Sequence, residues 1–427
     1  MAHTDNTSPS PVGEDARVFT GFSHASLWFS LGVGLLVMQV GAYLVPAMGT
    51  RDALIAIVIG SIVGSALLAS AAKLGCDSGL SSPGLMHRVY GSAFARLPVL
   101  LNIVQLMGWT TFELVVMRDG TAAIGERALG SPLNILWPTL LWGGVLTLLM
   151  TGSMLTLVRQ FVSSIGLPLV IGSLLWLSWH FISVASAQGL TSFMARTGDG
   201  SMGMLSAIDL VMAMPVSWLP LVADYARHGR SGRSTLAGTW VGYAMANAWC
   251  YALGFLVASV SEPGTDLVMA LLFAQGGLLA LGLILLDELD NAYGDVYSGA
   301  VSANSLKPSW SIRRWGLAMA VLCTALALVL PMHSLEPFLL MLSSVFVPLY
   351  GVILGRWSRV MRTLDDALPK VDLIAAALWL IGVAVFHAAA TWTPQYGSAL
   401  PSLLLTSVLA YLTRNAMHGA TMRGAVQ

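Results

Sequence analysis

Charged residues are scarce in this chain. Only 10% of the 427 residues are Asp, Glu, Lys or Arg, whereas a soluble globular protein carries roughly 25%. Hydrophobic residues make up 56% of the chain. Because so few polar side chains cannot cover a surface that faces water, lipid is expected to be the main solvent. This balance excludes most classes of soluble enzyme.

Cysteine is nearly absent, and the signatures of catalysis and metal binding are missing. Cys76, Cys250 and Cys323 lie far apart, without a CxxC pair or a nearby histidine, which excludes a disulfide framework and a zinc site. The chain contains no HExxH or GxSxG motif and no nucleotide-binding loop. We therefore expect no enzyme activity, no metal, no cofactor and no ATP hydrolysis by this chain. Its net charge of zero argues against a nucleic-acid partner.

Long apolar runs are what the chain does have. A membrane β-barrel would alternate apolar and polar residues, so unbroken runs predict membrane-spanning helices. At roughly 20 residues for each span, the apolar content allows about twelve, and twelve runs are present. The sequence thus predicts an all-α membrane protein of about 12 transmembrane helices. The predicted spans cover residues 24–48, 53–74, 95–117, 133–151, 161–184, 204–224, 235–260, 267–302, 315–332, 335–355, 372–391 and 397–413.

The segments between these runs predict the topology. Residues 1–20 are polar and lack the basic start and apolar core of a signal peptide, so we expect a disordered tail. Residues 185–203 form the longest predicted outside loop. With both termini in the cytoplasm, 17 of the 21 Lys and Arg residues fall inside and 4 fall outside. This asymmetry favours a multi-pass protein of the cell membrane, an inner membrane where there are two, with both termini cytoplasmic.

Polar side chains inside apolar runs are costly, so a cluster of them is a candidate site. On the third span, Gln105, Trp109 and Glu113 recur at intervals of four residues and share one helical face. A ring that stacks on a flat ligand, beside a carboxylate that bonds its polar edge, favours one wall of a small-molecule site. The alternative is a buried polar stripe that holds helices together.

The eighth span holds the densest cluster of acids. Asp287, Glu288, Asp290 and Asp295 lie within nine residues, with Asn291 among them. Four carboxylates cannot all stay ionised side by side in a medium of low dielectric. The cluster therefore favours a proton carrier or a set of cation ligands. The alternative is that several of these acids lie near the helix end and are solvated.

Two spans carry helix-breaking residues. On the sixth, Pro215 and Pro220 flank Trp218, and each proline removes a backbone donor. Such a break is tolerated where it lines a cavity or is buried in protein, and its free backbone groups can bind ligands. The first span holds glycines at mid-membrane together with Gln39. These features predict that the first and sixth helices are interrupted.

The two interrupted spans are five apart, and so are the two spans with polar clusters. This spacing predicts a 5+5 inverted repeat with a ligand site at mid-membrane between its halves. The predicted first repeat covers residues 21–200, the second covers 201–360, and spans 11 and 12 with the C-terminal tail cover 361–427. At the inner end of the sixth span, Asp224 and Arg227 are three residues apart and predict a structural ion pair.

Four strings occur in the same order, and on corresponding spans, as in a known family. They are SGLSSPGLMHRVYGSAFARLP before the third span, WTTF followed by Glu113, MPVSWLPLVADYAR on the sixth, and DVYSGAVSAN on the eighth. With them the chain resembles the nucleobase:cation symporter-1 family, the purine and cytosine permeases, over residues 22–360. The form MPVSWLPLVADY is most similar to the hydroxymethylpyrimidine permease branch, which salvages the pyrimidine half of thiamine.

The resemblance implies a leucine-transporter-type fold, alternating access and cation-coupled import. The family's third-span tryptophan stacks on the flat heterocycle and matches Trp109. The ring-edge residue one turn later, often Gln in the family, is Glu113 here, and a carboxyl suits an aminopyrimidine or cytosine better than an imide such as uracil. The predicted substrate-binding residues are Gln39, Gln105, Trp109, Glu113, Trp218, Asn291 and Asp295.

The chain departs from the family at the predicted cation site. Sodium-coupled members place a Ser–Thr pair on the eighth span, but residues 287–295 contain no Ser or Thr. Asp290 and Asn291 stand about where the pair is expected. Carboxylates there can bind sodium or carry a proton, and we favour the proton. The predicted coupling residues are Asp287, Glu288 and Asp290.

The predicted function is therefore import of hydroxymethylpyrimidine or a close nucleobase by a secondary transporter. A cytosine or purine symporter is the alternative within the same class. A channel is the alternative from a different class, although no filter-like repeat is present. The expected partners are the heterocyclic substrate and the lipid bilayer, with no obligate protein partner.

Overall fold

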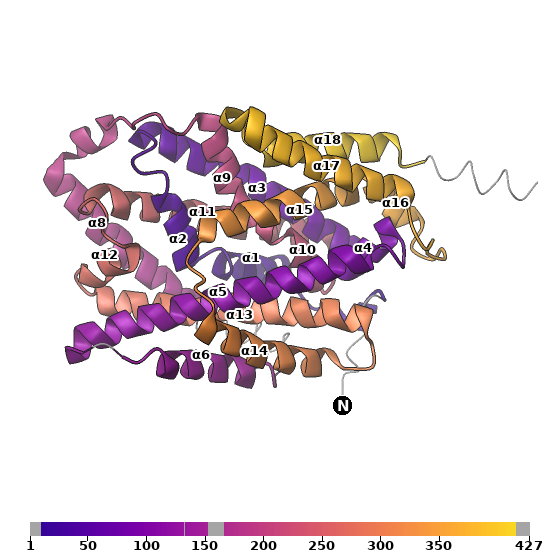
Figure 1. Ribbon diagram of the computed structural model, residues 1–427, viewed down its shortest axis with the longest axis horizontal. Helices are drawn as coiled ribbons and strands as arrows, with labels where there is room; N and C mark the ends of the chain where they lie inside the picture. Colours follow the sequence, from indigo (N-terminus) through magenta and orange to yellow (C-terminus); the bar gives the residue numbers. More distant parts are fainter. Residues whose placement is uncertain (1–9, 132, 153–165, 416–427) are drawn as a thin grey trace, which may run out of the picture.

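The computed structural model describes residues 10–131, 133–152 and 166–415, and Figure 1 shows a bundle of helices that run mostly along its long axis. Within these residues the regular structure is helical apart from one isolated bridge between Phe19 and Gly229. The predicted all-α fold is confirmed.

The longer helices are α1 (Gly21–Ser30), α2 (Leu35–Ala42), α3 (Thr50–Ser78), α4 (Ser82–Tyr90), α5 (Arg96–Leu129), α6 (Leu136–Leu149), α8 (Leu167–Ala195), α9 (Met204–Ser217), α10 (Leu219–Ala226), α11 (Gly232–Val260), α13 (Gly277–Leu306), α14 (Ile312–Val329), α15 (Leu335–Gly355), α17 (Leu373–Trp392) and α18 (Ala399–Leu412). The short ones are η1 (Glu14–Ala16), α12 (Leu267–Phe273), α16 (Trp357–Arg362) and η3 (Pro394–Tyr396).

The described helices match the predicted spans. Seven are long and apolar enough to cross a membrane, and two bent pairs complete one span each. The pairs are α1 with α2, bent by 61°, and α9 with α10, bent by 41°. These are the first and sixth predicted spans, so both expected interruptions are present. The shorter apolar helices α6 and α18, together with the acid-bearing α13, fall on the remaining predicted runs.

Two stretches differ from the prediction. Half of the predicted outside loop 185–203 is helical, because α8 continues to Ala195 through a kink at Gly189, where φ is 104°. The predicted eighth run is two helices: α12 ends at Phe273, and α13 begins after Gly276, whose φ of 70° is the left-handed conformation that favours glycine. Residues 161–165 of the predicted fifth span lie outside the described residues.

Each broken span is interrupted for a different local reason. In the first, α1 stops at Ser30, and Gly34 precedes α2 in an extended conformation with φ 165° and ψ 160°. In the second, α9 stops at Ser217 and Pro220 lies in the first turn of α10. Proline has no N–H for the carbonyl one turn earlier, so the helical hydrogen-bond ladder cannot continue through it.

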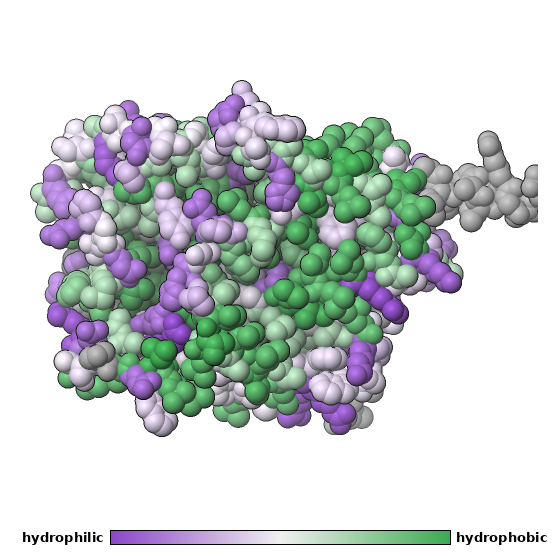
Figure 2. Space-filling model, in the orientation of Figure 1, coloured by the Kyte–Doolittle hydropathy of each residue, from purple (hydrophilic) through white to green (hydrophobic). Residues whose placement is uncertain are grey.

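The broken spans lie among other helices rather than at the edge. α1 and α2 pack on α11, α9 and α10 pack on α3, and α13 packs on α5. Large apolar side chains such as Val104, Trp137 and Leu373 are exposed on the outside. Figure 2 shows a broad apolar area over the middle and right of the visible face, with hydrophilic residues denser toward the two ends. This surface suits a bundle that is surrounded by lipid.

The last two long helices, α17 and α18, pack against α15 and lie along one border of the bundle (Figure 1). One carboxylate joins α18 to the sixth span. Asp209 on α9, with 9% of its surface exposed, accepts hydrogen bonds from the backbone N–H groups of Ser398, Ala399 and Leu400, at 2.7 to 3.2 Å. Backbone N–H groups at a helix start have no partner within the helix, so a buried anion stabilises them.

Residues 10–20, predicted as part of a disordered tail, are instead folded against the segments that follow α3 and α10. The Val12 N–H donates to the carbonyl of Gly79 at 3.0 Å. Phe19 is fully buried, its N–H donates to the carbonyl of His228 at 2.9 Å, and the Arg230 N–H donates back to Phe19 at 3.0 Å. The segment just before α1 is thereby joined to the segment just after α10. Residues 1–9 lie outside the described residues.

Candidate functional site

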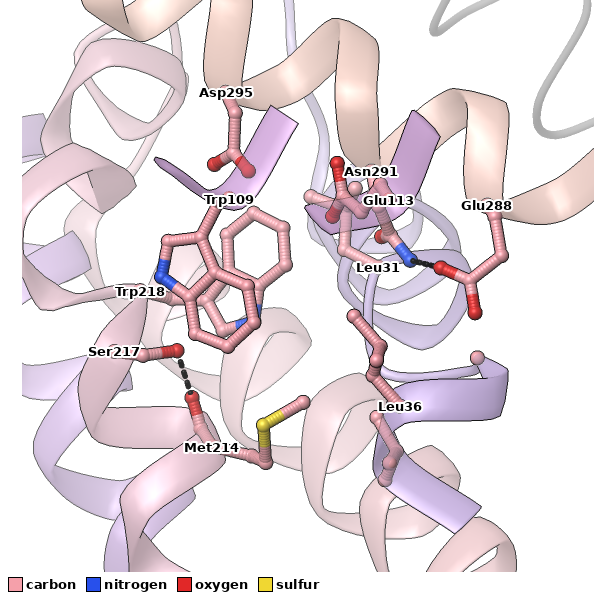
Figure 3. Close-up of a pocket in the computed structure, with 12 residues that line it drawn as sticks. Leu31, Leu36, Trp109, Glu113, Met214, Ser217, Trp218, Glu288, Asn291 and Asp295 are labelled. Atoms are coloured by element: carbon pink, nitrogen blue, oxygen red, sulfur yellow. Dashed lines mark hydrogen bonds between the residues drawn. The ribbon is translucent and has the colours of Figure 1, made fainter. Parts of the chain in front are cut away.

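A pocket lies where both broken spans meet α5 and α13 (Figure 3). About 370 Å³ of space not filled by atoms lies within its walls, part of it open to solvent. Main-chain breaks, aromatic rings and carboxylates all reach it. Its lining residues are Leu31, Gly34, Leu36, Val37, Trp109, Glu113, Met214, Ser217, Trp218, Glu288, Asn291 and Asp295.

Two indoles give the pocket flat apolar surface. Trp109 projects from α5, and Trp218 lies at the break between α9 and α10, with 5% and 7% of their surfaces exposed. Neighbouring rings fix both orientations. Trp109 packs edge-on against Phe338 at a centroid distance of 5.0 Å, and Trp218 packs edge-on against Trp28 at 5.9 Å. Such contacts hold a ring without covering both of its faces, so each indole can stack on a flat ligand.

The polar lining is acidic. Glu113, Glu288 and Asp295 are each at most 3% exposed, and the described lining residues include no Lys, Arg or His. The Oε2 atom of Glu113 is buried and has no hydrogen-bond partner among the described residues. An unpaired buried acceptor is costly, so this oxygen is available to a ligand that offers a donor, or to a proton.

Glu288 is held differently, at the start of α2. One carboxylate oxygen accepts the backbone N–H of Leu35, the first residue of that helix. The other accepts from Nδ2 of Asn291 at 3.3 Å, shown dashed in Figure 3, and this same amide lies 3.2 Å from the carbonyl oxygen of Val33. Gly34 makes the approach possible, because a Cβ there would lie 2.8 Å from the Glu288 oxygen.

The other two acids of the α13 cluster lie outside the pocket lining. Asp287 is buried and accepts from the Ser30 hydroxyl, at the end of α1, at 3.0 Å. Asp290 is half-buried, and its Oδ2 atom has no hydrogen-bond partner among the described residues. Asp287 therefore lies beside the first break, and neither acid lines the cavity. No group of three or more His, Cys, Asp or Glu among the described residues is arranged to hold a metal ion.

Two predicted substrate residues do not line the pocket. Gln105 is buried, and its Nε2 donates to Oδ1 of Asn102 at 2.8 Å. The Asn102 amide in turn donates to the carbonyl of Pro220 and the hydroxyl of Ser302, both at 3.0 Å. Gln105 thus belongs to a polar contact that joins α5, α10 and α13, which was the alternative interpretation of this stripe. Gln39 is half-buried on α2 and also lies outside the lining.

The predicted ion pair between Asp224 and Arg227 stays a prediction: Oδ2 of Asp224 and Nη1 of Arg227 are buried without hydrogen-bond partners among the described residues. The Arg227 Nε donates to the backbone carbonyl of Asp224, at 3.3 Å. The Asp224 carboxylate is turned toward the start of α4, where its Oδ1 accepts the N–H of Ser82 at 2.8 Å. A spacing of three residues on one helix could not reveal this competing partner on another helix.

Six lining residues were not among the predicted site residues. Most adjoin a break, and that was the one sequence signal that could have found them. The Ser217 hydroxyl, for example, donates to the carbonyl of Met214 at 2.7 Å, shown dashed in Figure 3. Glu288 was predicted for coupling, but the structure places it in the pocket wall. The six are Leu31, Gly34, Leu36, Val37, Met214 and Ser217.

Comparison with known proteins adds a family to this geometry. The model of the family described as permease for cytosine/purines, uracil, thiamine, allantoin matches residues 11–412. The cytosine permease of Escherichia coli (strain K12) is 24% identical to the chain over 449 residues, which cover 98% of each protein.

Solved structures show the same fold. Mhp1, a nucleobase-cation-symport-1 family transporter, in a closed conformation with bromovinylhydantoin bound, superposes with a TM-score of 0.77 at 18% identity over 96% of each chain. Its inward-facing conformation also gives 0.77, at 16% identity, over 97% of this chain and 94% of the other. The predicted leucine-transporter-type fold with broken first and sixth spans is confirmed.

Proposed function

Because the chain belongs to the family of permeases for cytosine/purines, uracil, thiamine and allantoin, we propose that it is a cation-coupled secondary transporter that imports hydroxymethylpyrimidine, the pyrimidine precursor of thiamine. The observation that carries the proposal is a pocket between two broken spans, in which two indoles and the unpaired Glu113 carboxyl converge. A flat heterocycle with a polar edge fits this combination.

The indoles and Glu113 divide the recognition of the ring. Trp109 and Trp218 offer stacking surface to its faces. An aminopyrimidine presents an exocyclic NH₂ donor beside a ring-nitrogen acceptor. A protonated Glu113 accepts from the first and donates to the second, whereas an ionised Glu113 pairs with a protonated ring. Asn291 and Asp295 also line the cavity and complete the proposed substrate contacts.

We assign coupling to the acids of α13. Asp287, which accepts from Ser30 at the end of α1, and Asp290 lie outside the pocket lining and are the proposed proton carriers, whereas Glu288 lies in the pocket wall with both oxygens hydrogen-bonded. Residues 287–295 contain no Ser or Thr, whose aliphatic hydroxyl could complete a sodium site of the usual kind. Carboxylates with unpaired oxygens at this depth suit proton transfer, so we propose proton coupling. The two bent spans, at 61° and 41°, supply the hinges for alternating access.

Cytosine is the second candidate substrate, because the cytosine permease of E. coli aligns over 98% of both chains. Cytosine carries the same amino group beside a ring nitrogen, so the Glu113 argument applies to it equally. At the other ring positions hydroxymethylpyrimidine carries a methyl and a hydroxymethyl group, whereas cytosine carries a carbonyl and a ring N–H. The apolar lining from Leu36, Val37 and Met214 would have to accept the methyl group.

Uptake into proteoliposomes tests the proposal. Labelled hydroxymethylpyrimidine is offered with cytosine as competitor, first under a pH gradient and then under a sodium gradient. We expect saturable uptake driven by the pH gradient and lost in Trp109→Ala and Glu113→Ala. Trp137→Ala is the matched control, because this indole is 69% exposed on the outside of the bundle. Non-saturable flux would favour a channel, and uptake of cytosine alone would favour the second candidate.

Glu113→Gln separates the two roles of this carboxyl. Glutamine keeps one acceptor and one donor but cannot change its charge. We expect the affinity for the neutral aminopyrimidine to stay within about tenfold while the pH dependence of binding disappears. Unchanged affinity, unchanged substrate ranking and unchanged pH dependence in Glu113→Gln would refute the assignment of Glu113 to the ring edge.

A further inference from the structure

The start of α2 opens into the pocket and is already occupied by an anion of the protein itself. Gly34 and Leu36, on either side of the first helical residue, both line the cavity. The N–H of that residue, Leu35, donates to the Glu288 carboxylate. A helix start concentrates unpaired N–H groups and partial positive charge, which makes it the natural place for the anionic group of a ligand. Here Glu288 fills that place from α13.

The hydrogen bonds indicate the carboxylate form of Glu288. Both oxygens act as acceptors, one from Leu35 N–H and the other from the Asn291 amide. An ionised carboxylate is an acceptor only, so it satisfies both donors at once. The side chain is 1% exposed and Gly34 provides the space it uses, since any Cβ there would collide with it. The Glu288 side chain is therefore fixed in the pocket wall by its hydrogen bonds and by its close approach to Gly34.

The rest of the polar lining adds to the same effect. Glu113 and Asp295 share the cavity with Glu288, and the described lining residues contain no basic side chain to offset them. The Asn291 Oδ1 and Glu113 Oε2 atoms are buried acceptors without partners among the described residues. The cavity thus offers acceptors and negative charge, and the start of α2 in its wall is filled.

We propose that Glu288 is a specificity-determining residue that takes the place of a ligand anion at the start of α2, so that the pocket admits neutral or cationic heterocycles rich in donors and rejects their carboxylates. This inference rests on the proposed function, because it names the charge class of the same substrate. It follows that a pyrimidine and its carboxylic acid derivative are sharply distinguished, although they share the ring that the indoles would stack on.

Competition binding with a matched pair of ligands tests this. The probe is labelled hydroxymethylpyrimidine bound to the purified full chain, and the competitors are the unlabelled compound and its 5-carboxylate. Juxtaposed like charges cost several kcal/mol, so the wild type should bind the carboxylate at least about 100-fold more weakly than the alcohol. Equal binding of the two by the wild type would overturn the proposal.

Three substitutions of Glu288 should affect discrimination against the carboxylate to different extents. Glu288→Asp keeps the charge and should keep the discrimination. Glu288→Gln removes the charge but leaves an acceptor for Leu35 N–H. The carboxylate should then bind only about tenfold more weakly than the alcohol. Glu288→Ala removes the charge and frees the donors, so the carboxylate should bind about as well as the alcohol. Glu262→Gln, an exposed acid outside the pocket, is the matched control and should behave as the wild type.

The outcomes separate this inference from the proposed function. If the wild type binds neither the alcohol nor cytosine, the proposed function fails. If it binds the alcohol, rejects the carboxylate, and keeps that ratio in both Glu288→Gln and Glu288→Ala, Glu288 is not the selective group and the inference fails. Each variant is checked for a monodisperse elution profile, and because two independent substitutions remove the charge, either folded variant decides the question.

Discussion

The two broken spans differ in how the polar backbone groups at the break find hydrogen-bond partners. At the first break, between α1 and α2, the free helix start is satisfied from outside the span, by Glu288 and Asn291 of α13. At the second, between α9 and α10, the polar contacts are local, as when Ser217 donates to Met214, and Pro220 has no N–H that would need an acceptor. The first break thus brings charge into the pocket and the second brings an indole. The difference suggests that one span governs which charge is accepted and the other governs how a flat ring is held.

The largest expected effect comes from closing the space at the first break. In Gly34→Ala the new Cβ would lie 2.8 Å from the Glu288 oxygen. Overpacking of this kind costs roughly 1–3 kcal/mol, so we expect uptake to fall about tenfold or more. Gly282→Ala on α13 is the control, since nothing lies within 4 Å of its added methyl group. Normal uptake by Gly34→Ala would show that Glu288 need not stay where the structure places it.

The second break is tested by restoring its missing donor. Pro220 lies where the hydrogen-bond ladder of α9 would have to continue into α10, and Pro220→Ala supplies the N–H that this continuation needs. We expect a straighter, more stable sixth span, a higher melting temperature and a maximal uptake rate lowered about fivefold, with little change in substrate affinity. Pro98→Ala, in the first turn of α5 where the ladder needs no donor, should change neither rate nor stability. An unchanged rate in Pro220→Ala would mean that the bend is not a hinge.

A smaller effect separates structural capping from selectivity. Asp209 places a carboxylate on the start of α18 as Glu288 does on α2, but outside the pocket lining. Asp209→Ala should lower the free energy of unfolding by about 2 kcal/mol and leave the ratio of alcohol to carboxylate binding unchanged. Thermal unfolding and the competition assay measure the two quantities. A changed ratio would show that capping at a distance also sets selectivity.

The smallest effect concerns the contact between the segment before α1 and the segment after α10, which joins the two broken spans. Burial and the nearby Arg227 lower the pKa of His228 from 6.5 to about 4. Because the neutral ring is favoured in the folded protein, its contribution to stability is complete above pH 6.5 and is lost as the pH falls toward 4. The protection factors of the Phe19 and Arg230 amides, corrected for the intrinsic exchange rate at each pH, should therefore fall as the pH is lowered over this range. His228→Asn should remove that pH dependence; if it persists there, another group is responsible.

The sequence predicted the parts of this protein that depend on one helix at a time. Apolar runs gave the spans, the interval of four residues placed Trp109 and Glu113 on one face, and prolines marked the second break. What it missed depends on contacts between helices. Gln105 lies on the same helical face as Trp109. Where α5 packs against α10 and α13, however, its amide donates to Asn102, which donates in turn to Pro220. The partners of Asp224 and Glu288 lie 142 and 253 residues away in the chain, beyond any local pattern.

The hydrogen bonds between Asp209 and the start of α18 also constrain the order in which the protein assembles during synthesis. Asp209 is synthesised 189 residues before Ser398, the first of its donors. During that interval α9 can enter the membrane, but its carboxylate has none of the three N–H partners it finds at the end of the chain. The hydrogen bonds of α9 are therefore completed only when the final helix is inserted. A chain that stops before Ser398 leaves the Asp209 carboxylate without these three donors, so correct assembly of the sixth span depends on the last part of the chain.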